Sequence, residues 1–197
     1  MIKKFFAIMA VASCLIMNSA QAIDSRVESA VQWACAIAND QTHGYSQGAE
    51  TATAYNPYTG SRDAPDYDCS SLVYYAFNHG GFNIIDNWHK NPKFMSRYNG
   101  KQYVGDADTI WEDLSVDGGW KKFSWAEVAD NLQRGDILCR PQFHVAIYIG
   151  DGKTVEARGV NNPRGGSYQT GDQGGEIDFY DAQGRGWTEV YRYTGGN

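Results

Sequence analysis

The chain has 197 residues, of which 42% are hydrophobic, 14% aromatic and 20% charged, and its net charge is −6. This length and apolar content are enough for one domain with a core of its own. An acidic chain without basic runs binds nucleic acids and anionic membranes poorly, so we expect neither as a partner.

The first 22 residues have the pattern of a secretory signal peptide. Lys3 and Lys4 precede an apolar run from Phe5 to Met17, and the triplet Ala20-Gln21-Ala22 is suited to signal peptidase. The apolar run is too short for a stable membrane anchor, and no later segment is apolar enough. We therefore expect an exported monomer, secreted, periplasmic or associated with the cell wall, in which residues 23–197 form one domain.

The cysteine count is informative for an exported protein. Cys14 lies in Val11-Ala12-Ser13-Cys14, which also fits a lipoprotein cleavage site, although the apolar residues that follow argue against it. Cleavage after residue 22 leaves Cys35, Cys69 and Cys139, and an odd count indicates one working thiol or an intermolecular bridge. If Cys69 is that thiol, the other two either form a disulfide or stay as buried free thiols.

The domain begins with helical periodicity. Apolar residues at spacings of three and four predict a helix over residues 25–39, and Ser25 with Glu28 has the pattern of a capping box at its start. Residues 40–68 are rich in Gly, Thr, Asn, Pro and Asp, which predicts a long loop. Loops of that length in compact domains are usually functional.

The long loop leads directly to Cys69. An apolar face of helical period over residues 70–77, followed by Gly80-Gly81, predicts a second helix, so Cys69 lies at a helix start. Between residues 82 and 123 the pattern is ambiguous, and it indicates only a helix around 108–114.

The second half of the domain has the pattern of a sheet. Ser124-Trp125-Ala126-Glu127 is a capping box that opens a short helix, and Asp151-Gly152 is a strong signal for a two-residue hairpin. Residues 161–175 form a glycine-rich polar loop. Strands are predicted over residues 137–139, 144–149, 154–157, 176–180 and 189–193. Helices followed by an antiparallel sheet predict an α+β fold with N-terminal helices packed on a central sheet.

Two residues of this layout are suited to nucleophilic catalysis. A thiol attacks a carbonyl as thiolate, and the positive end of the predicted helix would favour that anion at Cys69. His144, on the first strand of the hairpin, is the candidate to take the thiol proton. Cys and His also occur as ordinary core residues, so spacing alone leaves both interpretations open.

Other residues carry weaker signals. The four histidines (His43, His79, His89 and His144) show no HxxxH or CxxC spacing, so we expect no metal and no cofactor. Trp111, Trp120, Trp125 and Trp187 are candidates for saccharide stacking, although core packing is the more common role of a tryptophan.

The sequence segments around Cys69 and His144 resemble motifs of one family. Asp68-Cys69-Ser70-Ser71-Leu72-Val73 is similar to the Asp-Cys-Ser-Gly-Leu-Val signature of the NlpC-type cell-wall peptidases, a bacterial branch of the papain-like fold. Residues 135–138 (Gly-Asp-Ile-Leu) and 144–150 (His-Val-Ala-Ile-Tyr-Ile-Gly) resemble its second block. Residues 43–47 and 171–173 resemble a subgroup of secreted and phage-lysin-like enzymes. The resemblance covers residues 26–193.

The resemblance implies catalytic roles for three residues. Cys69 matches the nucleophile, and His144 matches the general base that later protonates the leaving amine. The position that orients the imidazole matches Glu156, whose carboxylate can accept the other imidazole N–H. Arg158 shares a strand face with Glu156 by period two, so an ordinary salt bridge between them is the competing interpretation.

Three further residues match positions that contact substrate. Tyr45 matches a tyrosine beside the nucleophile that helps to polarise the scissile carbonyl, although it could equally be a stacked loop aromatic. Asp68 and Ser70 match substrate-contact positions, where Asp68 would bind the free amine of a stem peptide. As the residue before a helix, Asp68 is an equally good N-cap.

The resemblance therefore implies a thiol hydrolase with peptidoglycan as its partner. Such an enzyme would cut amide bonds of stem peptides through an acyl-enzyme, as an endopeptidase or as an amidase. Two alternatives remain open: a cell-wall binding module without activity, and an acyltransferase of the same fold that passes the acyl group to an amine.

Overall fold

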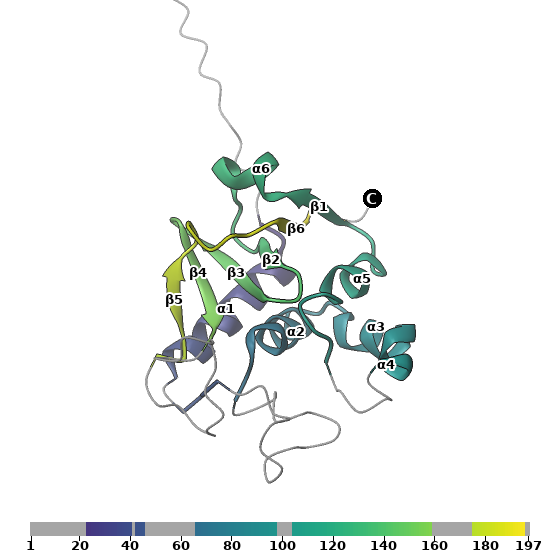
Figure 1. Cartoon of the computed structure of the whole chain (residues 1–197). Helices are drawn as coiled ribbons and strands as arrows, with labels where there is room; N and C mark the ends of the chain where they lie inside the picture. Colours follow the sequence, from purple (N-terminus) through teal and green to yellow (C-terminus); the bar gives the residue numbers. More distant parts are fainter. Residues whose placement is uncertain (1–22, 41, 46–65, 98–103, 159–174, 196–197) are drawn as a thin grey trace, which may run out of the picture.

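The structure, a computed structural model, describes residues 23–40, 42–45, 66–97, 104–158 and 175–195 (Figure 1). The expected signal peptide and most of both predicted loops lie outside these residues. Within the described ranges, no helix is long and apolar enough to cross a membrane. The architecture is the predicted α+β fold, with helices packed on an antiparallel sheet.

Most helices precede most strands along the chain. The helices are α1 (Ser25–Asn39), α2 (Cys69–His79), α3 (Ile84–Lys90), α4 (Pro92–Ser96), α5 (Ile110–Ser115) and α6 (Trp125–Val128), which runs into a 3-10 turn, η1 (Ala129–Asn131). The strands are β1 (Trp120–Ser124), β2 (Ile137–Arg140), β3 (His144–Gly150), β4 (Lys153–Ala157), β5 (Ile177–Asp181) and β6 (Glu189–Tyr193).

The sheet has the strand order β1-β6-β2-β3-β4-β5, and every neighbouring pair is antiparallel. The hairpin predicted at Asp151-Gly152 joins β3 to β4, and both turn residues have positive φ, 51° and 71°, as a type I′ turn requires. The last strand, β6, enters between β1 and β2. The sheet is therefore complete only when the end of the chain has been added.

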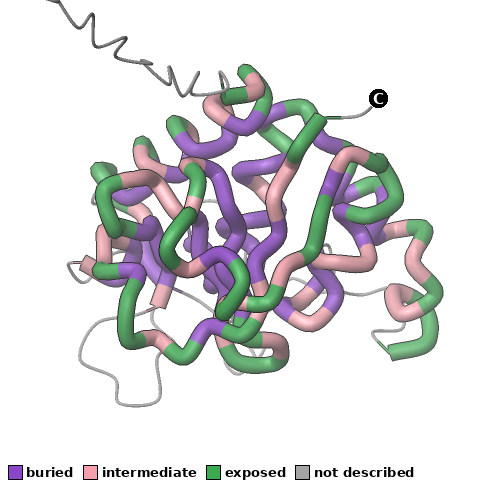
Figure 2. Tube along the Cα trace, turned by 90° about the horizontal axis from the view of Figure 1, so that it is seen from above, coloured by how far each residue is buried: buried purple, intermediate pink, exposed green. Residues whose placement is uncertain are grey.

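Alternation along the central strands gives each face of the sheet its own core. The main cluster, which includes residues of α1 and α2, takes Ile137, Cys139, Val145 and Ile147. The smaller cluster, on the opposite face, takes Leu138, Ala146, Trp187 and Val190. Figure 2 shows the buried segments running through the middle of the molecule, with exposed segments around them. Because each buried aliphatic side chain contributes roughly 1.5–3 kcal/mol, both faces stabilise the sheet.

Gly135 and Asp136 join the start of β2 to its neighbours. Gly135 has a φ of +92°, and a Cβ there would lie 2.0 Å from Cγ1 of Val27 on α1, so glycine is required. Asp136 is buried, and its two carboxylate oxygens accept hydrogen bonds from Nε and Nη2 of Arg192 on β6 at 2.7 and 2.6 Å. These contacts hold β2, and through it β3, against the helix.

The predicted capping box at the start of α1 is wrong. Asp24 is the N-cap, and its Oδ1 accepts a backbone N–H of the first turn at 2.9 Å. Glu28 instead forms an ion pair with Arg134 at 2.8 Å. Glu28 is engaged in this contact between distant segments and so does not complete a capping box. Asp24, and not Ser25, is the N-cap residue. The second predicted box, at Ser124, is present.

The ambiguous region between residues 82 and 123 contains more structure than the sequence predicts. Its predicted helix is α5, but α3, α4 and β1 also lie there. Helices of five and seven residues are too short to establish a helical period. Strand β1 lies at the edge of the sheet with mostly exposed side chains, so it lacks a clear alternation.

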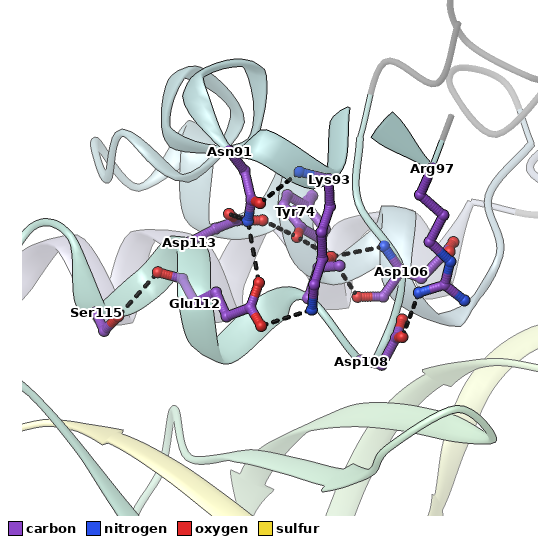
Figure 3. Close-up of polar contacts among 10 residues, drawn as sticks. Tyr74, Asn91, Lys93, Arg97, Asp106, Asp108, Glu112, Asp113 and Ser115 are labelled. Atoms are coloured by element: carbon purple, nitrogen blue, oxygen red, sulfur yellow. Dashed lines mark hydrogen bonds and ion pairs between the residues drawn. The ribbon is translucent and has the colours of Figure 1, made fainter. Parts of the chain in front are cut away.

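A polar network ties the helix of Cys69 to these short helices (Figure 3). The Tyr74 hydroxyl on α2 donates to Oδ2 of Asp113 on α5, and Asn91 Nδ2 donates to Oδ1 at 2.8 Å. At the edge of the network, Lys93 pairs with Glu112 at 2.6 Å. Burial raises the pKa of Asp113 to about 6, against the lowering effect of the hydrogen bonds from Asn91 and Tyr74.

We expect Asp113→Asn to reduce the pH dependence of stability. Because the folded-state pKa is raised, the folded protein retains a proton that the unfolded chain releases, so this contribution is full below about pH 4 and disappears above about pH 6. Between pH 5 and 7 the free energy of unfolding should fall by about 1 kcal/mol more in the unaltered protein than in the variant. Urea unfolding of both proteins at pH 5 and pH 7 measures the difference. An equal fall in the free energy of unfolding in the two proteins would contradict the prediction.

Candidate active site

Cys69 is the first residue of α2, as predicted, and its position is fixed by the cap of that helix. Oδ1 of Asp68 accepts the backbone N–H of Ser71 at 2.7 Å, while the Ser71 hydroxyl accepts the backbone N–H of Asp68 at 2.9 Å. The partial positive charge of a helix N-terminus stabilises a thiolate. Cys69 is 9% exposed, so the thiol lies at the edge of the core.

His144 is the first residue of β3, and it lies between a thiol and a carboxylate. Its Nε2 is 2.8 Å from Oε2 of Glu156 on β4. The Cys69 side chain is the other group that acts on the imidazole, and it raises the pKa of His144. Because Nε2 is engaged with Glu156, Nδ1 is the nitrogen that remains for the sulfur. The imidazole side chain is 25% exposed, so one part of it reaches solvent.

Glu156 is completely buried, yet both of its carboxylate oxygens have partners. Oε2 meets His144, and Oε1 accepts the hydroxyl of Thr154 at 2.6 Å. Thr154 lies two residues earlier on β4 and is also fully buried. A buried carboxylate is tolerated when its hydrogen bonds are complete, so Thr154 holds Glu156 in the orientation that faces the imidazole.

These contacts favour the charged form of the imidazole. Burial lowers the pKa of His144, but the hydrogen bonds and charges of Cys69 and Glu156 outweigh burial and raise that pKa to about 9. For Glu156, burial raises the pKa, and the contacts with His144 and Thr154 reverse the effect, so the net pKa is lowered. At neutral pH the site therefore holds an imidazolium between two groups that stabilise its positive charge.

Trp187 covers one face of the imidazole. The two rings are stacked, with centroids 5.7 Å apart and an interplanar angle of 18°. The indole is buried, and its Nε1 donates to the carbonyl of Ala182 at 2.7 Å. Its position fits core packing against His144. A stack of this kind limits the rotation of the imidazole and excludes water from that side.

The residues expected to contact substrate lie around the start of α2. Tyr45 is buried and forms a parallel β-bridge with Tyr67, which places it close to the segment that precedes Cys69. Asp68 caps the helix as described above. Ser70 is buried, and its hydroxyl donates to Asp68 Oδ1 at 3.0 Å. The capping role of Asp68 is thus confirmed, whereas the substrate roles of all three residues remain predictions.

Two open alternatives, which concern Arg158 and the pair Cys35 and Cys139, are resolved by the structure. Arg158 forms no ion pair with Glu156; its guanidinium lies over the Tyr180 ring, 4.5 Å from the centroid. Cys35 and Cys139 are free thiols, and burial raises the pKa of both. Among the residues with described positions, no group of three or more His, Cys, Asp or Glu side chains could hold a metal ion.

Replacing Thr154 by valine should destabilise the protein through Glu156. Valine keeps the shape but leaves a buried carboxylate oxygen without its donor, so we expect the free energy of unfolding to fall by roughly 1–3 kcal/mol. Thr154→Ser retains the hydroxyl and should restore most of that loss. Urea unfolding of both variants measures the effect. Equal losses in valine and serine would show that packing, and not the hydrogen bond, is what Thr154 contributes.

An α+β domain that joins a cysteine at a helix start to a histidine and a carboxylate on strands has the papain-like arrangement. The sequence pattern of the NlpC/P60 family matches residues 45–191. The chain therefore belongs to the NlpC/P60 family.

Solved structures of similar fold include the P60 domain of antigen MAP1204 from M. avium subspecies paratuberculosis. It is 18% identical over 86% of this chain and 98% of that one, with a TM-score of 0.47. The peptidoglycan hydrolase RipB from Mycobacterium tuberculosis is 20% identical over 89% and 70% of the two chains, with a TM-score of 0.44. No curated protein matches the sequence.

Proposed function

We propose that the chain is a cysteine hydrolase that cleaves amide bonds in the stem peptides of peptidoglycan. Membership of the NlpC/P60 family supports the reaction class. The observation that carries the proposal is the continuous series of contacts from the Cys69 thiol through the His144 imidazole to the buried Glu156 carboxylate. At neutral pH those contacts keep a proton on His144, next to the sulfur that would attack.

In the proposed reaction, the Cys69 thiolate attacks the scissile carbonyl carbon. The oxyanion forms near the positive end of α2, with the Tyr45 hydroxyl as a further donor. The imidazolium of His144 gives its proton to the leaving amine, and the C–N bond breaks to leave a thioester. Neutral His144 then takes a proton from water, and the resulting hydroxide attacks the thioester. Loss of the acid product restores the thiolate and the imidazolium, while Glu156 stays ionised throughout.

Because peptidoglycan lies outside the cytoplasm, the proposed reaction takes place there. Residues 1–22 would direct export and be removed, leaving a monomeric domain over residues 23–197 that acts in the periplasm, at the wall or in the medium. Asp68 and Ser70 would contact the stem peptide beside Cys69. The mass of the exported protein tests the cleavage site: a chain that begins at Ile23 is expected, and a lipid on Cys14 would contradict it.

Purified sacculi and defined muropeptides test the function directly. We expect the protein to release fragments whose masses show hydrolysis of a peptide or amide bond. Fragments joined to an added amine would instead identify an acyltransferase. Binding to sacculi without any fragment would identify a wall-binding module and overturn the proposal.

A further inference from the structure

Three arginines around the candidate active site lack the carboxylate partner that the other described arginines have. Arg26, Arg97, Arg134 and Arg192 each form an ion pair. Arg140, Arg158 and Arg185 form none within the described part of the chain. The net charge of the chain is −6, so acidic residues outnumber basic ones. Three described arginines without an ion pair in one region are therefore not what the composition alone predicts. We call these three residues the arginine rim.

Arg140 lies beside the imidazole. It is the register partner of His144 across the β2–β3 pair, so the two side chains leave the sheet on the same face. A methyl group added at Gly186 would lie 3.9 Å from Nη1 of Arg140, which places the guanidinium next to the residue preceding Trp187. Arg140 is therefore close to the stacked pair of His144 and Trp187.

Arg158 and Arg185 lie around the neighbouring strands. Both guanidinium groups cover the Tyr180 ring, 4.5 and 5.1 Å from its centroid. Tyr180 on β5 is the register partner of Thr154, which holds Glu156. The charge of Arg185 is close enough to Glu156 to contribute to the lowering of its pKa.

Three nearby acids, Asp178, Asp181 and Glu156, form no ion pair with these arginines. Asp178 is the register partner of Glu156, and its carboxylate accepts the backbone N–H of Phe179 without an ion pair to the rim. Asp181 pairs with Lys153 at 2.6 Å. Glu156 itself is fully engaged with His144 and Thr154.

Contacts with aromatic rings leave the guanidinium groups of the arginine rim able to bind a planar anion. The Arg140 guanidinium lies 4.2 Å from the centroid of Phe143, a residue that directly precedes His144 and is 67% exposed. Nε of Arg185 donates to the backbone carbonyl of Asp181 at 3.2 Å, which fixes that side chain. A guanidinium held by its face against a ring keeps its in-plane N–H groups available, and these match the two oxygens of a carboxylate.

We propose that the arginine rim binds free carboxylates of an acidic peptide on either side of the amide that Cys69 attacks. This inference rests on the proposed function and specifies the substrate it selects: stem peptides with ionised carboxylates, in preference to those in which the same groups are carboxamides. A carboxamide has no charge and offers one acceptor oxygen, so it loses the paired hydrogen bonds with Arg140 or Arg185.

Binding to an inactive protein tests this preference separately from turnover. The probes are a fluorescein-labelled stem tetrapeptide with free carboxylates and its carboxamide counterpart, titrated by fluorescence anisotropy against the full mature chain with Cys69→Ala. We expect the carboxylate peptide to bind about tenfold more tightly. Adding Arg140→Gln or Arg185→Gln should reduce that ratio by roughly three- to tenfold.

Lys121→Gln is the matched control. Lys121 is an exposed cation on β1, at the edge of the sheet away from β3 and β4, and the ratio should not change when it is replaced. Equal affinity for the two peptides, no binding of the carboxylate peptide, or an equal effect of all three substitutions would overturn the inference. The protein could prefer the carboxylate peptide and yet, with Cys69 intact, release no fragment from sacculi. In that case the hydrolase proposal fails, whereas the inference that the arginine rim binds carboxylates is retained.

Discussion

Replacing Cys69 by alanine is expected to lower the hydrolysis of stem peptides by about 10⁴-fold or more, because no other group of the site can form the acyl-enzyme. Binding of the peptide should remain, since alanine leaves the helix cap and the imidazole in place. Muropeptide digestion followed by mass spectrometry measures the loss. A variant that still cuts at a tenth of the original rate would remove Cys69 from the mechanism.

Cys35→Ala provides a control for loss of a thiol. Cys35 is partly buried on α1, where alanine is well tolerated in the helix, and activity should be retained. Alkylation adds a second readout that does not depend on turnover. At pH 6, iodoacetamide should modify Cys69 first, because burial raises the pKa of both Cys35 and Cys139. Modification of the three thiols at the same rate would mean that no thiolate is stabilised at Cys69.

Glu156→Gln should reduce kcat/KM by roughly 10- to 10³-fold and move the alkaline limb of its pH profile. Glutamine keeps the shape and an acceptor oxygen for the imidazole N–H, so the main change is loss of the negative charge. The pKa of His144 is raised to about 9 partly by that charge. Activity that needs the imidazolium is present below this pKa and lost above it, so the limb should move from near pH 9 to lower pH.

Asp181→Asn is the control for the loss of one carboxylate from this part of the sheet. Asp181 is exposed on β5 and pairs with Lys153, and its replacement should leave the alkaline limb in place. If Glu156→Gln gives an unchanged limb and nearly full turnover, Glu156 has no part in orienting or charging the imidazole. A lower rate with an unchanged limb would assign it a structural role only.

The sequence predicts the elements with strong local signals. The hairpin at Asp151-Gly152 could be predicted because its turn requires a positive φ at both central residues, and Asp-Gly is one of the few pairs that accept this. Helix α2 follows from its apolar face and from the glycines that end it. The meeting of His144 with Glu156 could also be predicted, because the resemblance assigns the carboxylate to the strand next to that of the histidine.

The remaining features depend on contacts between distant segments. Thr154 could have been suggested by period two, since a hydroxyl two residues before a buried glutamate shares its face. Nothing in the sequence around Trp187 indicates that it stacks on a histidine 43 positions earlier. The pairing of Glu28 with Arg134 likewise overrides a local capping signal.

The entry of β6 between β1 and β2 affects when reactivity can arise. Cys69 belongs to the first helix after the long loop, whereas His144 and Glu156 are on β3 and β4, and the sheet that supports them is completed by β6. A partly folded chain without β6 therefore lacks the complete sheet that supports these residues. We therefore expect the proposed thiol chemistry to appear only after β6 has joined the sheet.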